Sequence, residues 1–290
     1  MEFYKNYYPI TATPFQKNKE YMELAPCAEL APYVRCFWGT ETPIKQRKTE
    51  IPAIGMVIPD TCVDVMFFIN YTKNKISSSF CGINDVVFYI NSWNDTEDEI
   101  SNFCVRFYAW SANLFSEESM KDTKNGHFDA GLHFEPFKRY MESILFEKHT
   151  LKERSLAAQE YLLKYLYVKK ENSLFVRAMN AIMEQQGNLK TLELAKELHI
   201  SSRQMERVFL QNMGITPKKA ASLIRYQCLW QEMCFHPRFQ ILDAVHKYGY
   251  TDQAHLLNEF RKIHGISFSE ARRHAFQNVD FLQENKMNFR

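Results

Sequence analysis

The chain has 290 residues, of which 46% are hydrophobic and 14% aromatic. This length and composition exclude an intrinsically disordered or fibrous chain and favour two globular domains. The 36 Lys/Arg and 34 Asp/Glu residues nearly cancel, and a net charge of +2 alone points to no class of partner.

No targeting segment is recognisable at the start of the chain, MEFYKNYYPITATPF, because a charged start followed by an apolar run is missing. No stretch approaches the ~20 apolar residues that a membrane-spanning helix needs. Seven cysteines without regular spacing indicate reduced thiols rather than a disulfide framework. We expect a soluble, cytoplasmic protein with no membrane partner.

Four segments between residues 30 and about 110 are rich in Val, Ile, Phe and Tyr and are separated by turn-forming residues. They read YVRCFWGTET, GMVIPDTCVDVMFFIN, DVVFYINSW and ISNFCVRFYAW. Short apolar segments at such spacings predict the strands of a small β-sandwich or barrel. From about residue 136 apolar residues recur every three or four positions, which predicts helices.

Asp60, Cys62 and Asp64 alternate along one of these strands, so their side chains share a face. They form either the polar wall of a pocket, with Arg106 as counter-ion, or a turn aspartate, a buried cysteine and an internal ion pair. The large aromatic residues nearby, Trp93 and Trp110 among them, either line a cavity or belong to the core. The candidate effector pocket comprises Trp38, Asp64, Arg106 and Tyr108.

Patterns for catalysis are missing from this half of the chain. Its three histidines are each more than five residues from the next, and its cysteines lie nine or more residues apart. Metal sites need clustered histidine and carboxylate ligands or closely paired cysteines. A glycine-rich phosphate loop and a nucleophile elbow are also lacking. We expect no catalytic residue, no metal and no cofactor.

The C-terminal third begins with two short helices. TLELAKELHI (191–200) predicts one helix with Thr191 as its N-cap, and SSRQMERVFLQNMGITP (201–217) predicts another that Gly214 ends. Two helices joined by so tight a turn pack at a steep angle as a helix-turn-helix. The expected apolar face of the first helix comprises Leu192, Leu194, Ala195 and Leu198.

The second helix has two distinct faces. Arg203 and Arg207 lie within roughly 40° of each other around its axis, since successive residues advance by about 100°. Met205 and Phe209 form an opposite, apolar stripe. One face is suited to burial, and the other projects cations.

The same pattern occurs twice. TDQAHLLNEFRKIHGISF (251–268) repeats the second helix at an offset of 51 residues, which pairs Phe209 with Phe260. ILDAVHKYGY (241–250) precedes this copy as the first short helix precedes the other. KKAASLIRYQCLWQEMC (218–234) predicts a helix that connects the two units.

Residues from about 175 to 275 resemble the DNA-binding domain of the AraC/XylS family of bacterial transcription regulators. The resemblance rests on LAKELHISSRQMERVFLQNMGITPKKAASLIR and ILDAVHKYGYTDQAHLLNEFRKIHGISFSEARRH. In that family two helix-turn-helix units place their second helices in successive major grooves. The distribution of charge agrees with this resemblance. Residues 175–276 hold 14 Lys/Arg against 9 Asp/Glu, a net charge of +5, and because the whole chain has +2 the rest of it has −3.

The N-terminal half is similar to a family of sensory domains that precede such DNA-binding domains. The usual forms there read Pro-Asp-Gly-Cys-x-Asp and Val-Arg-Phe-x-Pro-Gly, against VIPDTCVDVMFFI and FCVRFYAW here. Thr61 replaces the glycine, and Ala109 and Trp110 replace Pro-Gly, so the resemblance extends to the fold and not to a ligand. The helical stretch 151–168 offers Leu156, Leu163 and Leu166, and either caps the sheet or mediates a dimer.

We therefore predict an α+β chain, with an N-terminal β-sandwich or barrel, following helices, and an all-α C-terminal domain of two helix-turn-helix units. The expected divisions are a β-rich sensory domain at 1–135, a helical linker or dimerisation segment at 136–172, the double helix-turn-helix domain at 173–276 and a tail at 277–290.

The resemblance implies a sequence-specific, effector-responsive transcription regulator that reads DNA with helices at about 201–213 and 252–264. The expected partners are double-stranded DNA, a small-molecule effector, RNA polymerase and a second copy of the chain. Carried over by position, the base-facing side chains are Arg203, Glu206 and Arg207 in the first helix and Gln253, Ala254 and Asn258 in the second. Candidate phosphate contacts are Ser201, Ser202, Lys218, Thr251, Arg261 and Lys262.

Two alternatives belong to other classes. One is an interaction protein whose helical domain binds another protein, which Arg203 and Arg207 disfavour because such a surface would present apolar anchors. The other is an enzyme fused to a DNA anchor, which the missing catalytic pattern disfavours. Activation and repression are both compatible with the sequence.

Overall fold

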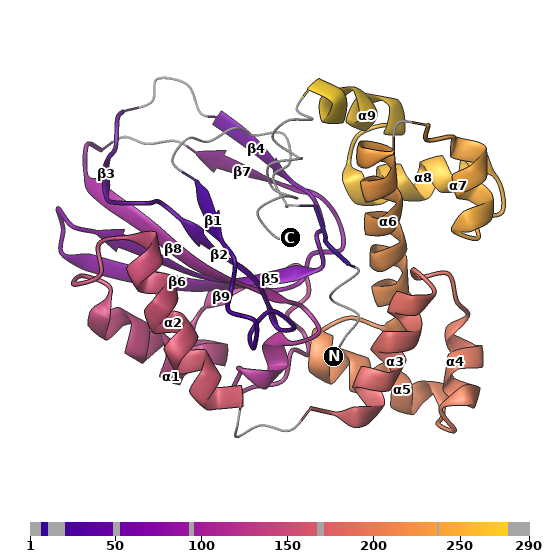
Figure 1. Ribbon diagram of the computed structural model, residues 1–290, viewed down its shortest axis with the longest axis horizontal. Helices are drawn as coiled ribbons and strands as arrows, with labels where there is room; N and C mark the ends of the chain where they lie inside the picture. The colour runs from indigo at the N-terminus through magenta and orange to yellow at the C-terminus, as the bar shows by residue number, and fades with distance from the viewer. Residues whose placement is uncertain are drawn as a thin grey trace.

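The computed structural model describes residues 7–10, 21–48, 53–92, 96–166, 171–236 and 238–277. Its N-terminal half is built on one antiparallel sheet in the order β1-β2-β8-β5-β6-β9, with β3 added beside β8 (Figure 1). These strands are β1 Met22–Leu24, β2 Val34–Gly39, β3 Ile44–Lys45, β5 Cys62–Asn70, β6 Lys75–Cys81, β8 Glu99–Tyr108 and β9 His127–Asp129. Two further strands, β4 Ala53–Val57 and β7 Phe88–Ser92, pair as a separate antiparallel ribbon.

One face of the sheet is apolar and is covered by helices. Val65 and Phe67 of β5 and Phe107 of β8 are buried on it, as the alternation of strand side chains requires. Helices α1 (Gly131–Ile144) and α2 (Leu151–Leu166) pack there, and the ring of Phe137 lies 5.9 Å from that of Phe67. The expected sheet followed by helices is confirmed, as is the α+β class.

Helix α1 starts earlier than the sequence periodicity indicates. It begins at Gly131 rather than near Pro136, which lies inside it. Phe134 adopts non-helical angles (φ −132°, ψ 37°), so the helix is kinked two residues before the proline. This agrees with the steric restriction that proline places on the preceding turn.

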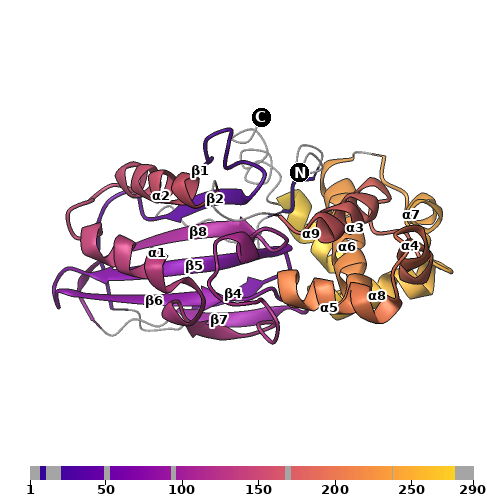
Figure 2. The same cartoon turned by 90° about the horizontal axis from the view of Figure 1, so that it is seen from below.

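Seven helices form the C-terminal part of the described chain, and α5 and α8 both lie along its lower edge in Figure 2. Helix α6 is the common support, because only Lys218 of its residues is exposed. The helices are α3 Ser173–Glu184, α4 Thr191–Glu197, α5 Ser202–Met213, α6 Pro217–Phe235, α7 Ile241–Lys247, α8 Gln253–His264 and α9 Phe268–Gln277.

The two repeats match closely in their second helices. Helices α5 and α8 each have 12 residues at an offset of 51, and Ser201 and Asp252 cap them by accepting a bond from a main-chain N–H. Both end at a left-handed glycine, Gly214 or Gly265. The preceding helices, α4 and α7, are offset by 50, so the second turn is one residue longer.

Two details of the first unit differ from expectation. Leu192, expected on the buried face of α4, is 65% exposed, because it lies roughly 160° around the helix axis from the buried Leu194. The N-cap of α4 is Lys190, and Thr191 is the first helical residue without a capping hydrogen bond. Among the described helices, none is both long and apolar enough to cross a membrane.

We predict that Phe209→Ala and Phe260→Ala each lower the free energy of unfolding by about 3–5 kcal/mol, because each removes a buried ring. Chemical denaturation of the full chain measures this effect. Leu192→Ala is the control and should change stability by no more than about 0.5 kcal/mol. Wild-type stability for either phenylalanine variant would contradict the repeat register.

A second prediction concerns acid. His264 is buried, its Nδ1 lies 2.7 Å from the Tyr226 hydroxyl, and burial lowers its pKa to about 3. Since an unfolded histidine titrates near ~6.5, the unfolded chain binds an extra proton below that pH. Stability should therefore fall as pH drops from about 6.5 towards 3, by up to ~1.4 kcal/mol per pH unit. Denaturation midpoints between pH 7 and 5 test this, and His264→Gln should flatten the slope.

Candidate nucleic-acid interface

Helix α5 presents a basic face to solvent. Met205 and Phe209 are buried against the domain core, and Arg203 and Arg207 are exposed on the opposite side. Glu206 is also exposed, about 100° around the axis from Arg207. The sequence prediction for the two faces of this helix is therefore confirmed.

Helix α8 presents a less charged face. Ala254 and Asn258 are exposed opposite the buried Leu256 and Phe260, and the 51-residue offset pairs them with Arg203 and Arg207. The same offset pairs His255 with Gln204, and both are exposed beside that face. Sequence reasoning missed His255 and Gln204, although applying the repeat offset to every exposed position would have found them.

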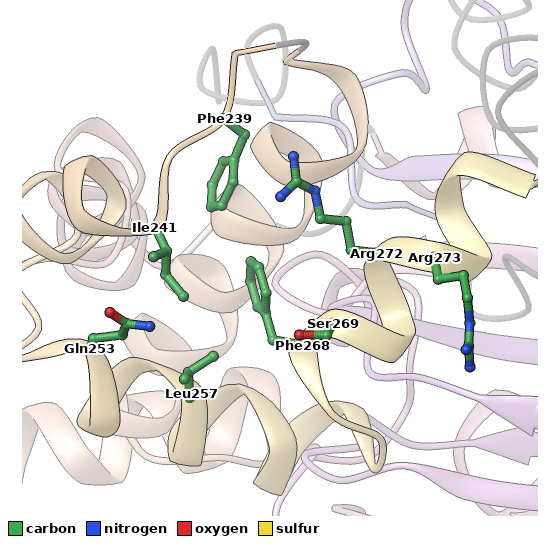
Figure 3. Close-up of a pocket in the computed structure, with 8 residues that line it drawn as sticks. All are labelled: Phe239, Ile241, Gln253, Leu257, Phe268, Ser269, Arg272 and Arg273. Atoms are coloured by element: carbon green, nitrogen blue, oxygen red, sulfur yellow. The ribbon is translucent and has the colours of Figure 1, made fainter.

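Gln253 lies on the flank of α8 rather than on the face that holds Asn258. Together with Leu257 it borders a cavity of about 510 Å³, and both side chains project towards Ile241 in Figure 3. By the repeat offset Gln253 corresponds to Ser202, and half-buried Leu257 corresponds to Glu206. The cavity is lined by Phe239, Ile241, Gln253, Leu257, Phe268, Ser269, Arg272 and Arg273.

A larger groove of about 1010 Å³ separates the two helix-turn-helix units. It contains Asn258 from α8 and is mainly basic, with six Lys/Arg against three Asp/Glu. The charged residues that line it are Lys190, Lys196, Lys218, Lys219, Arg225 and Lys262, and Asp85, Glu193 and Glu259.

The acidic residues of this groove are already paired. Lys190 lies 3.2 Å from Glu193, Lys219 lies 3.2 Å from Asp85, and Arg225 lies 2.7 Å from Glu259. Within the part of the chain that the structure describes, the other three cations have no acidic partner. These are Lys196 on α4, Lys218 on α6 and Lys262 on α8.

Glu259 connects α8 to α6. Its carboxylate accepts hydrogen bonds from Arg225 and from the Ser222 hydroxyl (2.7 Å each), and His255 Nε2 lies 3.5 Å away. Burial opposes ionisation, but the bonds from Arg225 and Ser222 lower the pKa of Glu259. The Arg225–Glu259 ion pair therefore fixes α8 against α6, while the neighbouring Asn258 is exposed to solvent.

The predicted phosphate contacts fall at several places on this surface. Ser201 caps α5 through a bond from Gln204 N–H, and Lys218 follows Pro217 at the start of α6. All six candidates are exposed: Ser201, Ser202, Lys218, Thr251, Arg261 and Lys262.

Three of the four candidate effector residues meet on the sheet face opposite α1 and α2. Arg106 donates two hydrogen bonds of 2.8 Å to Asp64, and Trp38 Nε1 donates to the same carboxylate at 3.3 Å. Asp60 lies 3.5 Å from Arg106, and burial raises the pKa of Asp60 to about 6 although Arg106 opposes that shift. The internal ion pair of the two alternatives is thus present.

The fourth residue, Tyr108, lies two positions from Arg106 on the same face of β8, but another ring covers it. Tyr108 stacks on Trp110 with ring centroids 4.5 Å apart, and both are buried in the core. Trp93 lies outside the described residues. On the same sheet face as Arg106, Ser79 Oγ and Asn102 Oδ1 are buried without a hydrogen-bond partner among the described residues.

No group of three or more His, Cys, Asp or Glu side chains within the described ranges is arranged to hold a metal ion. The seven cysteines are all free thiols. For Cys36, Cys62 and Cys104, burial raises the pKa well above the usual thiol value. They are therefore protonated and poorly nucleophilic.

Comparison with known families decides what the paired units are. Residues 194–274 match a family model described as a helix-turn-helix domain. The chain carries an AraC-type helix-turn-helix domain. Residues 22–129 match a second family model, a domain of unknown function, which covers the sheet that precedes the AraC-type domain. No curated protein matches the chain.

Among solved structures, the chain is similar to ToxT from Vibrio cholerae. One such structure has 10% identity and a TM-score of 0.41, and covers 82% of this chain and 98% of ToxT. Unsaturated fatty acid bound ToxT has 11% identity and a TM-score of 0.38, with 81% and 94% covered.

We predict that Arg225 and Glu259 are energetically coupled. A double-mutant cycle of Arg225→Met and Glu259→Gln, measured by denaturation of the full chain, should give a coupling energy of about 1–3 kcal/mol. The reason is that each single variant leaves its half-buried partner without a counter-charge. Additive effects would mean that α8 is held by apolar packing alone.

Proposed function

We propose that the chain is a sequence-specific transcription regulator that reads successive major grooves of DNA with α5 and α8. The observation that carries this proposal is the groove between the two units. Lys196, Lys218 and Lys262, one from each surrounding helix, lack acidic partners among the described residues. A phosphate backbone that passes between two major-groove contacts would meet all three cations.

Phosphate contacts supply affinity without sequence preference. Each cation that neutralises a phosphate releases condensed counter-ions, so binding weakens as salt rises. The uncharged candidates, such as Ser201 and Thr251, fix the register of the protein on the duplex. Lys196 joins this set because of its place in the groove.

Base reading falls to the exposed faces of the two helices. Arg203 and Arg207 can each pair with guanine through two hydrogen bonds, and Asn258 can pair with adenine in the same way. Ala254 offers only a methyl contact to thymine. The first half-site should therefore dominate specificity, with Gln204, Glu206, Gln253 and His255 as further candidates at the edges of these faces.

An effector is proposed to bind the sheet face that carries Trp38, Asp64 and Arg106. Ser79 Oγ and Asn102 Oδ1 support this site, because a ligand able to donate and accept hydrogen bonds would satisfy them. Asp64 already neutralises Arg106, so the site favours an uncharged polar molecule over an anion. Whether effector binding then raises or lowers transcription by RNA polymerase depends on the promoter.

A homodimer is proposed through α2 or the sheet. Leu156 on α2 is 56% exposed, whereas Leu163 and Leu166 pack against the core. Tyr140, Tyr161 and Tyr165 stack in a row along α1 and α2 beside them. Two linked copies gain affinity for paired sites without any new base contact.

We predict that Arg207→Ala costs about 1–3 kcal/mol of specific binding and relaxes preference at one base pair. Lys218→Ala should weaken binding to every sequence and reduce the salt slope by about one. Mobility shifts on sequences selected from a random pool, at several salt concentrations, test both. Equal losses on selected and random DNA for Arg207→Ala would remove it from the reading set.

A separate prediction tests the proposed dimer contact at Leu156. Leu156→Lys should convert the full chain from dimer to monomer in sedimentation and weaken binding to paired sites by about a hundredfold. Lys164→Ala, on the same helix, is the control because its side chain is exposed and forms an ion pair with Glu160 of the same helix. If Leu156→Lys leaves the sedimentation coefficient unchanged, α2 does not mediate the dimer.

A further inference from the structure

We propose that the sheet domain sets the spacing between the two DNA half-sites that the chain accepts. It does so without touching DNA, by holding the C-terminal ends of both reading helices. This inference rests on the proposed function and adds a specificity determinant to it. The sheet domain makes three contacts with the helical domain, one at the end of each of α5 and α8 and one along α6.

The first contact is at the end of α5. Met120 N–H, from the loop before β9, donates to the carbonyl of Gln211 at 2.9 Å. A Cβ atom on Gly214, the residue that ends α5, would lie 2.6 Å from Met120 O and 2.8 Å from Thr123 Oγ1. The sheet domain therefore touches the main chain of the first reader where a side chain would not fit.

The second contact is similar and lies at the end of α8. Val87 N–H donates to the carbonyl of Ile263 at 3.0 Å. A Cβ atom on Gly265 would lie 2.5 Å from Val87 Cγ1. Gly214 and Gly265 are equivalent in the two repeats, so the sheet domain holds the same point of both readers.

A left-handed glycine is also the ordinary end of a helix, and that alone would explain both residues. It does not explain what surrounds them. The nearest atoms to the added Cβ belong to Met120, Thr123 and Val87 of the sheet domain, and none belongs to the helical domain. The close approach is therefore a second constraint on the same two positions.

The third contact holds α6. Gln227 is 0% exposed, and its side chain accepts from Ile10 N–H at 3.0 Å and donates to Pro59 O at 2.6 Å. Near the start of α6, Lys219 pairs with Asp85 of the loop that leads to Val87. A buried amide with both ends bonded to the other domain resists sliding, because a shift would leave polar atoms unpaired.

These contacts bear on DNA spacing because of the geometry of the duplex. Major-groove sites one turn apart are about 34–36 Å from centre to centre, and each base pair inserted between them adds ~3.4 Å and about 34° of rotation. In the described chain the two units join through α6, whose 19 residues span roughly 28 Å and can bend. A sheet braced against both readers opposes that bending.

The test uses Gly265→Ala in the full chain, with Gly265→Ala/Val87→Ala as the matched rescue, since the second change removes the Cγ1 atom that the new methyl meets. Both variants share the strain of alanine at positive φ, so they differ only in the contact with Val87. Val87→Ala alone completes the double-mutant cycle. Hydrogen exchange without DNA comes first. We expect the Val87 amide to exchange about tenfold faster in Gly265→Ala and to recover in the rescue, with the Met120 amide as internal control.

DNA binding follows, on duplexes that the wild-type chain selects from a random pool and on derivatives with one base pair added or removed between the protected segments. The wild type should lose roughly five- to a hundredfold in affinity on the altered spacing. Gly265→Ala should lose no more than about threefold, and the rescue variant should recover the wild-type penalty.

Different outcomes test the spacing role and the proposed DNA-binding function. Unchanged Val87 exchange in Gly265→Ala would overturn the inference, as would faster exchange together with the wild-type spacing penalty. In both cases the proposed function stands. If the wild type enriches no sequence from the pool, the proposed function itself fails and the spacing role falls with it.

Discussion

The near-complete burial of α6 is the constraint on which the rest of the molecule depends. This helix supports the second helix-turn-helix unit through Tyr226 and Trp230, whose rings both pack against Phe260, and supports the sheet domain through Gln227. A helix buried on nearly all sides cannot be amphipathic, and its apolar residues are accordingly spread around the axis. The exposed polar side chains of the domain therefore lie on the helices that pack around α6, and α5 and α8 present such faces.

The polar groups enclosed by this packing are satisfied in different ways. Gln227 bonds main-chain groups of the other domain, Glu259 is bonded by Arg225, and Asp64 is bonded by Arg106. Each arrangement fixes an orientation, because a buried polar group left unpaired is costly. The same requirement makes Ser79 and Asn102 conspicuous, since their buried oxygens have no such partner among the described residues.

Much of this architecture is predictable from the sequence. The helix-turn-helix repeat, the connecting helix, the caps at Gly214 and the central strands all follow from local patterns. Strand β6 was missed because its serines, SSS at 77–79, lack the apolar alternation of a strand, and pairing with β5 decides its conformation instead. His255 was missed because the second reading face was carried over by resemblance and not by the repeat offset.

The contacts of the sheet domain with the ends of α5 and α8 could not have been predicted. They use main-chain atoms of Met120, Val87 and Ile263, which leave no mark in side-chain chemistry. The placement of Gln253 beside a cavity likewise depends on the packing of α7 and α9 around α8. Local patterns give the elements and their faces, whereas the distances between elements come from tertiary packing.

The equal length and matching caps of α5 and α8 have a consequence for how binding preference can change. Arg203 and Arg207 occupy the same helical positions as Ala254 and Asn258. The two helices therefore present different exposed side chains from equivalent positions on equivalent backbones. Ala254→Arg together with Asn258→Arg would give both helices an arginine pair at the same two exposed positions, while Gln253, His255 and Leu257 would still differ from Ser202, Gln204 and Glu206. Under the proposed function, the base preference of one helix can therefore change through its exposed side chains, because the buried residues that hold the helix in place stay the same.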